Sequence, residues 1–292
     1  MEELKINETS LKNKFSYCQF NCSFNESQPN YNNYLKFVDW MNWISIGIGL
    51  PLTLIVIIAV FSQVKRDQGA PVYIINLLFA DLIQLCSRIP MNLLSDDILI
   101  VLIVIWYFSL LASVGFMVCI SFERYLVIAM PLWYRFRRNI KTSVVVCVMV
   151  WILSLLLLLF VFMSPVMGIY ILPAFLLLPF PLFIFFLVGT FKTLSGALSV
   201  PADEKRRIIA IQVVVLLIYA LLYLPIIALL FSFDLINKGL HVVAPVCMFL
   251  SPLADTTLYL FIRKSVLDKF LVSLCSCKLC NNQEIVPNIK TV

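Results

Sequence analysis

The sequence has few charged side chains and almost no histidine. Of its 292 residues, 13% are Asp, Glu, Lys or Arg, and His241 is the only histidine. An intramembrane hydrolase needs a nucleophile beside a base, and a proton sensor built on coupled histidines needs more than one group that titrates near neutrality. The chain also has no phosphate loop, metal-ligand cluster or dinucleotide fingerprint. The sequence therefore argues against an enzyme, and proton sensing would have to rely on carboxylates.

Apolar residues are abundant instead. They make up 62% of the chain, and the mean hydropathy is +0.98, more than a soluble domain of this length needs. A membrane-spanning helix takes about 20 apolar residues. Seven such runs predict an all-α, polytopic bundle of seven transmembrane helices, at about 40–63, 72–92, 98–122, 143–164, 168–191, 208–232 and 241–262.

The basic residues predict the orientation of this bundle. Lys and Arg near helix ends stay on the cytoplasmic side, and an outer N-terminus places 16 of the 22 basic residues in the inner loops and tail. Three glycan acceptor sites, at Asn7, Asn21 and Asn25, fall in the predicted outer tail. The net charge of +6 is therefore a consequence of topology, and we expect no binding to nucleic acid.

These features divide the chain into three parts. We expect an extracellular glycosylated tail over 1–39, the seven-helix domain over 40–262, and a cytoplasmic part over 263–292. The first helix would direct its own insertion, because no cleavable signal precedes it. The cytoplasmic part begins with an amphipathic stretch near 263–272 that could lie on membrane lipids as a short helix.

The cysteines fall into two compartments. Cys18 and Cys22 lie in the outer tail and could bridge locally or remain free. A trio in the inner tail suits palmitoylation, and the alternative is a set of reduced, inert thiols. The trio consists of Cys275, Cys277 and Cys280.

Short motifs recur along the seven segments in a fixed order. The first two segments contain Gly49-Leu50-Pro51-Leu52-Thr53 and Asn76-Leu77-Leu78-Phe79-Ala80-Asp81. The third ends in Glu123-Arg124-Tyr125, followed by Pro131. The later segments contain Trp151, Pro179, the frame of Tyr219, Leu222, Tyr223 and Pro225, and Asp255-Thr256-Thr257-Leu258-Tyr259. Together these motifs resemble those of the rhodopsin-like (class A) G-protein-coupled receptors along the whole transmembrane length.

The resemblance implies a mechanism. Arg124, flanked by Glu123 and Tyr125, would be the switch for a heterotrimeric G protein, and outward movement of the sixth helix would open its cleft. Tyr219, Tyr223 and Pro225 would form the sixth-helix switch, and Tyr259 would support the open form. The aspartate of the last frame is most similar to the branch of nucleotide, lysolipid, protease-activated and proton-sensing receptors.

The chain departs from the family pattern at six positions. Lys205 stands where an acidic residue often holds the switch arginine, so that lock cannot form. Leu99 replaces the cysteine of the usual outer disulfide. The other departures are Thr53 for asparagine, Leu187 for tyrosine, Tyr223 for tryptophan and Thr256 for proline.

Two carboxylates fall inside membrane helices, where ionisable groups are costly and usually functional. Asp81 and Asp255 could form a sodium or proton site, with Ser113 and Ser251 as neutral oxygen donors by family position. The alternative is a water-bridged polar network that only joins helices. No other cofactor is expected.

The outer half of the bundle offers few polar candidates for a ligand pocket. Arg88 shares the helix face of Asp81 and could hold a phosphate or carboxylate, although it could also extend to the interface or pair with Asp96 or Asp97. By family position, Trp106 and Tyr107 would line the upper third helix, and His241 lies near the outer end of the seventh.

An apolar pocket with one cation favours a lipid acid, a lysophospholipid or another small molecule as the extracellular ligand. Basic residues are missing from the outer halves of the third and sixth segments, so nucleotides are disfavoured. The second outer loop is short, at about 164–168. We thus expect a multi-pass plasma-membrane receptor.

Other classes fit less well. A retinal protein needs a lysine in the seventh helix, and 241–262 has none. A secondary transporter is the remaining alternative, since Asp81, Arg88 and Asp255 could line a polar pathway. That class would predict internal repeats and broken helices, and no repeat is seen.

Overall fold

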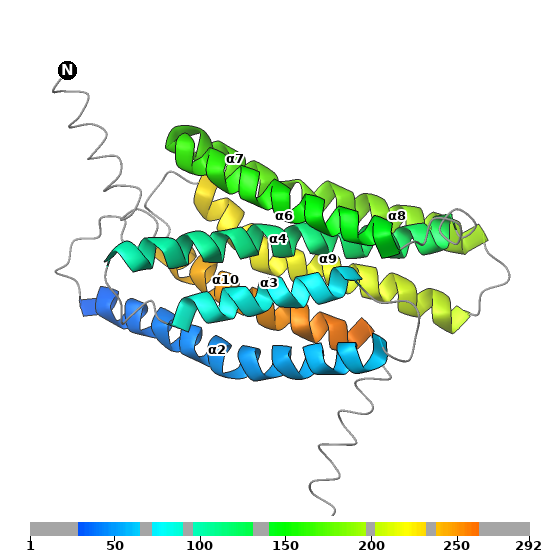
Figure 1. The fold of residues 1–292 in the computed structure, drawn as a ribbon, viewed down its shortest axis with the longest axis horizontal. Coiled ribbons are helices and arrows are strands. Elements are labelled where there is room, and N and C mark those ends of the chain that lie inside the picture. Colours follow the sequence, from blue (N-terminus) through cyan, green and yellow to red (C-terminus); the bar gives the residue numbers. More distant parts are fainter. Residues whose placement is uncertain are drawn as a thin grey trace, which may run out of the picture.

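The computed structural model describes residues 29–64, 72–89, 96–130, 140–196, 202–231 and 238–262. The regular elements in these ranges are helices, which run roughly along one axis (Figure 1). Helical structure satisfies each backbone N–H and C=O within its own segment, which a bilayer interior demands. The helices are α2 (Pro29–Val64), α3 (Val72–Arg88), α4 (Asp96–Ala129), α6 (Ile140–Met163), α7 (Pro165–Leu177), α8 (Pro179–Gly196), α9 (Ala202–Phe231) and α10 (Lys238–Ile262).

The predicted seven-helix arrangement is confirmed. In chain order the seven spans are α2, α3, α4, α6, the pair α7 and α8, α9 and α10. Six spans are long and apolar enough to cross a membrane. The remaining one, α3, has 17 residues, or about 25 Å at 1.5 Å per residue. The predicted amphipathic helix after the seventh span lies outside the described residues.

Several predicted helix ends were wrong. The first helix begins at Pro29 rather than near residue 40, and the third continues past residue 122 to Ala129. The second ends at Arg88 rather than near residue 92. Hydropathy marks the part of a helix that needs an apolar solvent, whereas backbone hydrogen bonding continues for one or more turns into polar sequence.

The fifth span is interrupted at Leu178. The Leu178 N–H donates to the Ala174 carbonyl over 3.1 Å, which closes the last turn of α7. Pro179 then begins α8, and a proline has no N–H to continue the ladder. Pro181, two residues on, removes a second donor. Two prolines thus separate α7 from α8 within one membrane span.

The junction between the fourth and fifth spans is shorter than predicted. Ser164 alone separates α6 from α7, and its N–H donates to the Phe160 carbonyl over 3.1 Å. The expected loop over 164–168 is therefore wrong, because α7 already begins at Pro165. Proline is well suited to a first helical position, where its missing N–H would be unpaired anyway.

The surface of the bundle is apolar. Leu221 is 71% exposed and Met163 is 84% exposed, and many other large aliphatic and aromatic side chains face outward. In water such a surface would aggregate, but hydrocarbon solvates it. The exposed apolar belt therefore agrees with membrane insertion.

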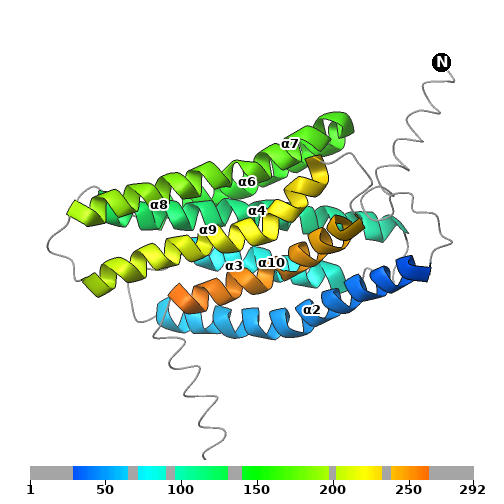
Figure 2. The ribbon, with the colours of Figure 1, turned by 180° about the vertical axis from the view of Figure 1, so that it is seen from behind.

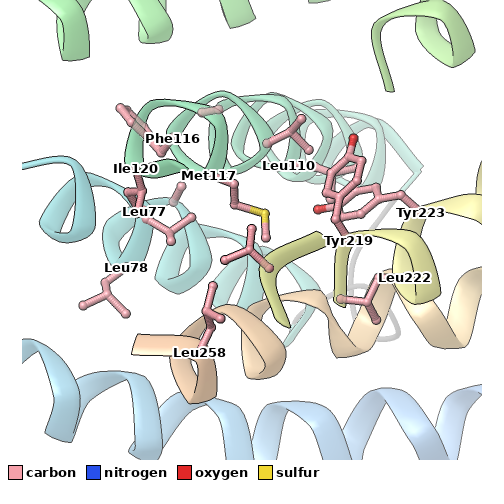
Figure 3. Packing of buried hydrophobic residues seen from close by; sticks show 14 of the residues in the cluster. Leu77, Leu78, Leu110, Phe116, Met117, Ile120, Tyr219, Leu222, Tyr223 and Leu258 are labelled. Atoms are coloured by element: carbon pink, nitrogen blue, oxygen red, sulfur yellow. The ribbon is translucent and has the colours of Figure 1, made fainter. Parts of the chain in front are cut away.

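The core lies where α4 meets its neighbours. In both views α4 runs through the middle of the bundle with α3 beside it, and α10 packs on α3 (Figures 1 and 2). The side chains of Leu77, Met117 and Leu258 converge from three of these helices (Figure 3).

Candidate functional site

Two buried carboxylates meet at the hydroxyl group of Ser113. Ser113 Oγ donates to Asp255 Oδ2 over 3.0 Å and lies 3.5 Å from Asp81 Oδ1. The three side chains come from α10, α4 and α3, and all are buried. The predicted meeting of Asp81, Ser113 and Asp255 is therefore present, and Ser113 is the link between the two acids.

One oxygen of each of these two carboxylates has no partner among the described residues. Asp81 Oδ2 and Asp255 Oδ1 are buried and make no hydrogen bond within the described part of the chain. Ser251 does not fill this role, because its hydroxyl donates to the Met248 carbonyl of its own helix over 3.1 Å. Two carboxylates with free oxygen atoms and one shared hydroxyl suit a hard cation or a proton.

A pair of threonines lies beside this centre. Thr53 Oγ1 and Thr256 Oγ1 are 3.0 Å apart, and Thr256 Oγ1 also donates to the Pro252 carbonyl over 2.8 Å. Since the Thr256 proton is used in that bond, Thr53 is the donor between the two hydroxyls. Two positions that depart from the family pattern, one in α2 and one in α10, are therefore in direct contact.

A polar anchor between α3 and α6 is also formed. Trp151 Nε1 donates to Asn76 Oδ1 over 3.0 Å, and Asn76 Nδ2 donates to the Val72 carbonyl over 2.9 Å. An indole N–H in a membrane needs such an acceptor. This contact fixes α6, whose surface is otherwise largely exposed, against the helix that carries Asp81.

Glu123, Arg124 and Tyr125 lie in the last two turns of α4. The Nε atom of Arg124 is buried and has no partner in the described part of the chain. Tyr125 stacks on Phe186 of α8 with 5.7 Å between ring centroids. A Cβ atom placed on Gly189 would lie 2.5 Å from the Tyr125 ring, so that glycine allows α8 to approach. Arg124 thus lies near the C-terminal end of α4.

The predicted switch tyrosines in α9 lie in the core. Tyr219 and Tyr223 stack with 4.4 Å between ring centroids. Figure 3 shows both side chains in the core. Tyr219 donates its hydroxyl to the Leu176 carbonyl of α7 over 2.7 Å, while the Tyr223 hydroxyl is buried without a partner among the described residues. Pro225 lies further along α9. The hydrogen bond connects the sixth span to the last turn before the break in the fifth.

The Arg88 side chain turns into the bundle. It is 1% exposed, so it does not extend to the interface. Its Nε donates to the Gln84 carbonyl and its Nη1 to the Phe249 carbonyl, both over 3.2 Å. Trp106 is also buried, and its ring centroid lies 6.2 Å from that of Phe249. Tyr107 packs on Trp106 at 4.9 Å.

Sequence reasoning missed three contributors to this outer layer. Gln84 is one turn before Arg88 on the same helix, and a search for polar residues spaced by four would have found it. Ser45 of α2 donates to the Phe249 carbonyl. Phe249 itself carried no signal in the sequence, because its role depends on its backbone oxygen.

Other predicted sites lie where the structure describes no side chain. These are Lys205 and His241, whose backbones belong to α9 and α10. The glycan acceptors Asn7, Asn21 and Asn25 and the thiols Cys275, Cys277 and Cys280 lie outside the described residues altogether. Within the described part, no group of three His, Cys, Asp or Glu residues is placed to hold a metal ion.

Known proteins match the first half of the bundle. The model of the 7 transmembrane receptor (rhodopsin family) matches residues 52–167. That range includes Asp81, Ser113 and Arg124 and ends before Tyr219 and Asp255.

Individual receptors also match part of the chain. Mas-related G-protein coupled receptor member B2 of Mus musculus is 37% identical over 122 residues, which cover 38% of this chain and 35% of that protein. Member X1 of Homo sapiens is 35% identical over 114 residues, which cover 37% of this chain and 35% of that protein. G-protein coupled receptor 68 of Mus musculus is 32% identical over 118 residues, which cover 37% of this chain and 32% of that protein. The match thus spans about a third of the length of each of these curated relatives.

Proposed function

Since the chain belongs to the rhodopsin family of seven-transmembrane receptors, we propose that it transmits an extracellular signal to a heterotrimeric G protein. The observation that carries this proposal is the position of Arg124. A guanidinium group with a buried Nε that has no partner among the described residues lies near the C-terminal end of α4, which the predicted orientation places on the cytoplasmic side. A buried donor of this kind is costly unless another state of the molecule uses it. A G-protein segment entering beside α4 would supply acceptors.

The conformational step is an outward movement of the cytoplasmic part of α9. Pro225 lies inside this helix and removes one backbone hydrogen bond, so the segment before it can swing with little loss of ladder bonding. Tyr219 lies in that segment and is bonded to Leu176. The movement would break this bond and open a cleft beside Arg124. Lys205, at the start of α9, would add no attraction to Arg124 in the closed form.

The acidic pair would hold a sodium ion in the closed form. Asp81 and Asp255 would supply charged oxygens, and Ser113 would supply a neutral one. This fits because one oxygen of each acid is buried without a partner in the described ranges, and a monovalent cation would reduce the repulsion between the two acids. A shared proton is the competing occupant and would serve the same structural role.

The ligand would enter the outer half of the bundle and be a lipid or another small molecule. Trp106 and Tyr107 lie there, and the surrounding side chains are mostly apolar. The single-residue junction at Ser164 leaves little chain between the fourth and fifth spans to cover this end. Such an arrangement suits an apolar ligand with a small polar group.

The chain is a multi-pass membrane protein with apolar helices. We place its N-terminus outside the cell, with glycans on the tail and palmitate on the inner thiols. No enzymatic role is proposed. The transporter alternative gains nothing from the relatives given above, all of which are named as G-protein coupled receptors.

The test is guanine-nucleotide exchange across a panel of G proteins in cells that express the chain. Wild type and Arg124→Ala are compared at matched surface levels, with extracts of lipids and small metabolites as stimuli. The proposal expects exchange, on at least one G protein, that disappears in Arg124→Ala. Equal responses in the two proteins would refute a role for Arg124.

A further inference from the structure

Arg88 is a buried cation to which the described side chains supply no matching anion. Its Nε and Nη1 donate to backbone carbonyls, and its guanidinium carbon lies 5.1 Å from the centroid of the Phe249 ring. Its Nη2 is buried and has no partner among the described residues. Within the described part of the chain it makes no ion pair, and a charge kept from water in this way is costly.

Three further polar atoms around this cation are also buried and lack partners within the described ranges. They are Nε2 and Oε1 of Gln84 and Nε1 of Trp106. Gln84 lies one turn from Arg88 on α3, and Trp106 approaches from α4 against the same Phe249 ring. We refer to Arg88, Gln84, Trp106 and Phe249 as the Arg88 cluster. Its unpartnered groups are mostly N–H donors, so it lacks an acceptor rather than a donor.

The nearest layer of acids does not complete this cluster. Asp81 and Asp255 interact through Ser113, and neither of these two described carboxylates forms an ion pair with Arg88. Asp81 is seven residues before Arg88 in the same helix, which places their backbones about 10 Å apart along its axis. The described carboxylates therefore supply no acceptor for the remaining N–H group of Arg88.

We propose that the Arg88 cluster binds one carboxylate group carried by an apolar molecule. A planar carboxylate can accept from the Arg88 fork and from further neutral donors, and the Trp106 indole and the Gln84 amide are the unpartnered neutral donors of the cluster. One guanidinium balances one negative charge, so a phosphate dianion would leave a charge uncompensated. The core side chains packed around the cluster would contact the apolar body. This inference deepens the proposed function, on which it rests, by naming the ligand class of the outer site.

The test measures binding and not signalling. Purified chain in lipid nanodiscs is heated with decanoate, with decanol, or with decyl phosphate, and the unfolding temperature is followed against concentration. A ligand that binds only the folded state raises this temperature in a saturable way. We expect a saturable rise of the unfolding temperature with decanoate that decanol does not produce. The two probes have the same alkyl chain length and differ only in the headgroup.

Variants then assign the effect to the cluster. Arg88→Gln should weaken decanoate binding roughly 10- to 100-fold, from the usual strength of hydrogen bonds to charged groups, whereas Arg88→Lys should lose less. Trp106→Phe keeps an aromatic ring, removes the indole N–H, and should weaken binding by a smaller factor. It also serves as the test if Arg88→Gln does not fold.

The first three results that would overturn the inference come from decanoate. They are no response of wild type to decanoate, equal responses to decanoate and decanol, or an undiminished decanoate response in the variants. A response to decyl phosphate alone would also reject a carboxylate ligand. Because no G protein is present, these failures would leave the coupling proposal intact, and a failure of exchange through Arg124 would leave this site intact.

Discussion

Replacing Tyr219 with phenylalanine should raise ligand-independent signalling. The substitution removes one hydroxyl group and keeps the ring that packs on Phe180, Phe183 and Tyr223. What is lost is the 2.7 Å hydrogen bond to the Leu176 carbonyl. If α9 swings outward on activation, this bond holds only the closed form, and its loss shifts the balance toward the open form.

The size of the effect follows from the strength of such bonds. A neutral hydrogen bond contributes about 0.5–1.5 kcal/mol net, and bonds between membrane helices average about 0.6 kcal/mol. These values correspond to a roughly 2- to 12-fold rise in the ratio of open to closed receptor, with about 3-fold as the central expectation. Where the open form is rare, basal exchange should rise by the same factor.

The assay is basal guanine-nucleotide exchange at matched surface level, with Tyr223→Phe as the control. Tyr223 stacks on Tyr219 in the same helix, but its hydroxyl has no hydrogen-bond partner in the described part of the chain, so its removal breaks no such bond. Basal exchange should rise in Tyr219→Phe and stay near wild type in Tyr223→Phe. Equal changes in both, or a fall in Tyr219→Phe, would refute the assignment of the closed-state bond.

Three further predictions concern stability in detergent. A double-mutant cycle with Thr53→Val and Thr256→Val should give a coupling of about 1 kcal/mol through their shared hydrogen bond, and additive effects would contradict that contact. Sodium, compared with choline at equal ionic strength, should raise the unfolding temperature of wild type and not of Asp255→Asn; a sodium effect in both would place the ion elsewhere. Gly115→Ala should cost about 1–3 kcal/mol, because its Cβ would lie 2.7 Å from Val150, whereas Gly47→Ala, with nothing within 4 Å, should be neutral or stabilising; equal losses would reject the packing argument.

The number and order of the spans could be predicted because the bilayer imposes a strong pattern on the sequence. A stretch of about 20 apolar residues matches the thickness of the hydrocarbon layer and is longer than a soluble core usually requires. The helix ends could not be predicted as well, since α2 continues through polar sequence from Pro29 and α4 continues to Ala129. The break at Leu178 was visible in Pro179 and Pro181, but the junction at Ser164 was not, because Pro165 was assigned to a loop.

The candidate site also has features that the sequence could suggest and features that it could not. Residue type was enough to suggest that Asp81 and Asp255 turn into the bundle, because an ionisable side chain in a membrane helix is costly and usually faces the interior. The direction of the Arg88 side chain was open in the sequence, because its acceptors are backbone oxygens of Gln84 and Phe249 that no side-chain pattern encodes. The contact between Thr53 and Thr256 was hidden for a related reason, since each departure was considered alone and only the packing of α2 on α10 joins them.

Exchange by purified components tests the coupling claim most directly. The Tyr219→Phe protein, which should be active without ligand, is placed in nanodiscs with one heterotrimer of each G-protein class, and GDP release is timed. The same measurement is made on Tyr219→Phe with Arg124→Ala added. The account predicts that Tyr219→Phe accelerates release from at least one heterotrimer and that adding Arg124→Ala returns the rate to that of empty nanodiscs. Release at the empty-nanodisc rate with every heterotrimer, or acceleration that persists without Arg124, would contradict it.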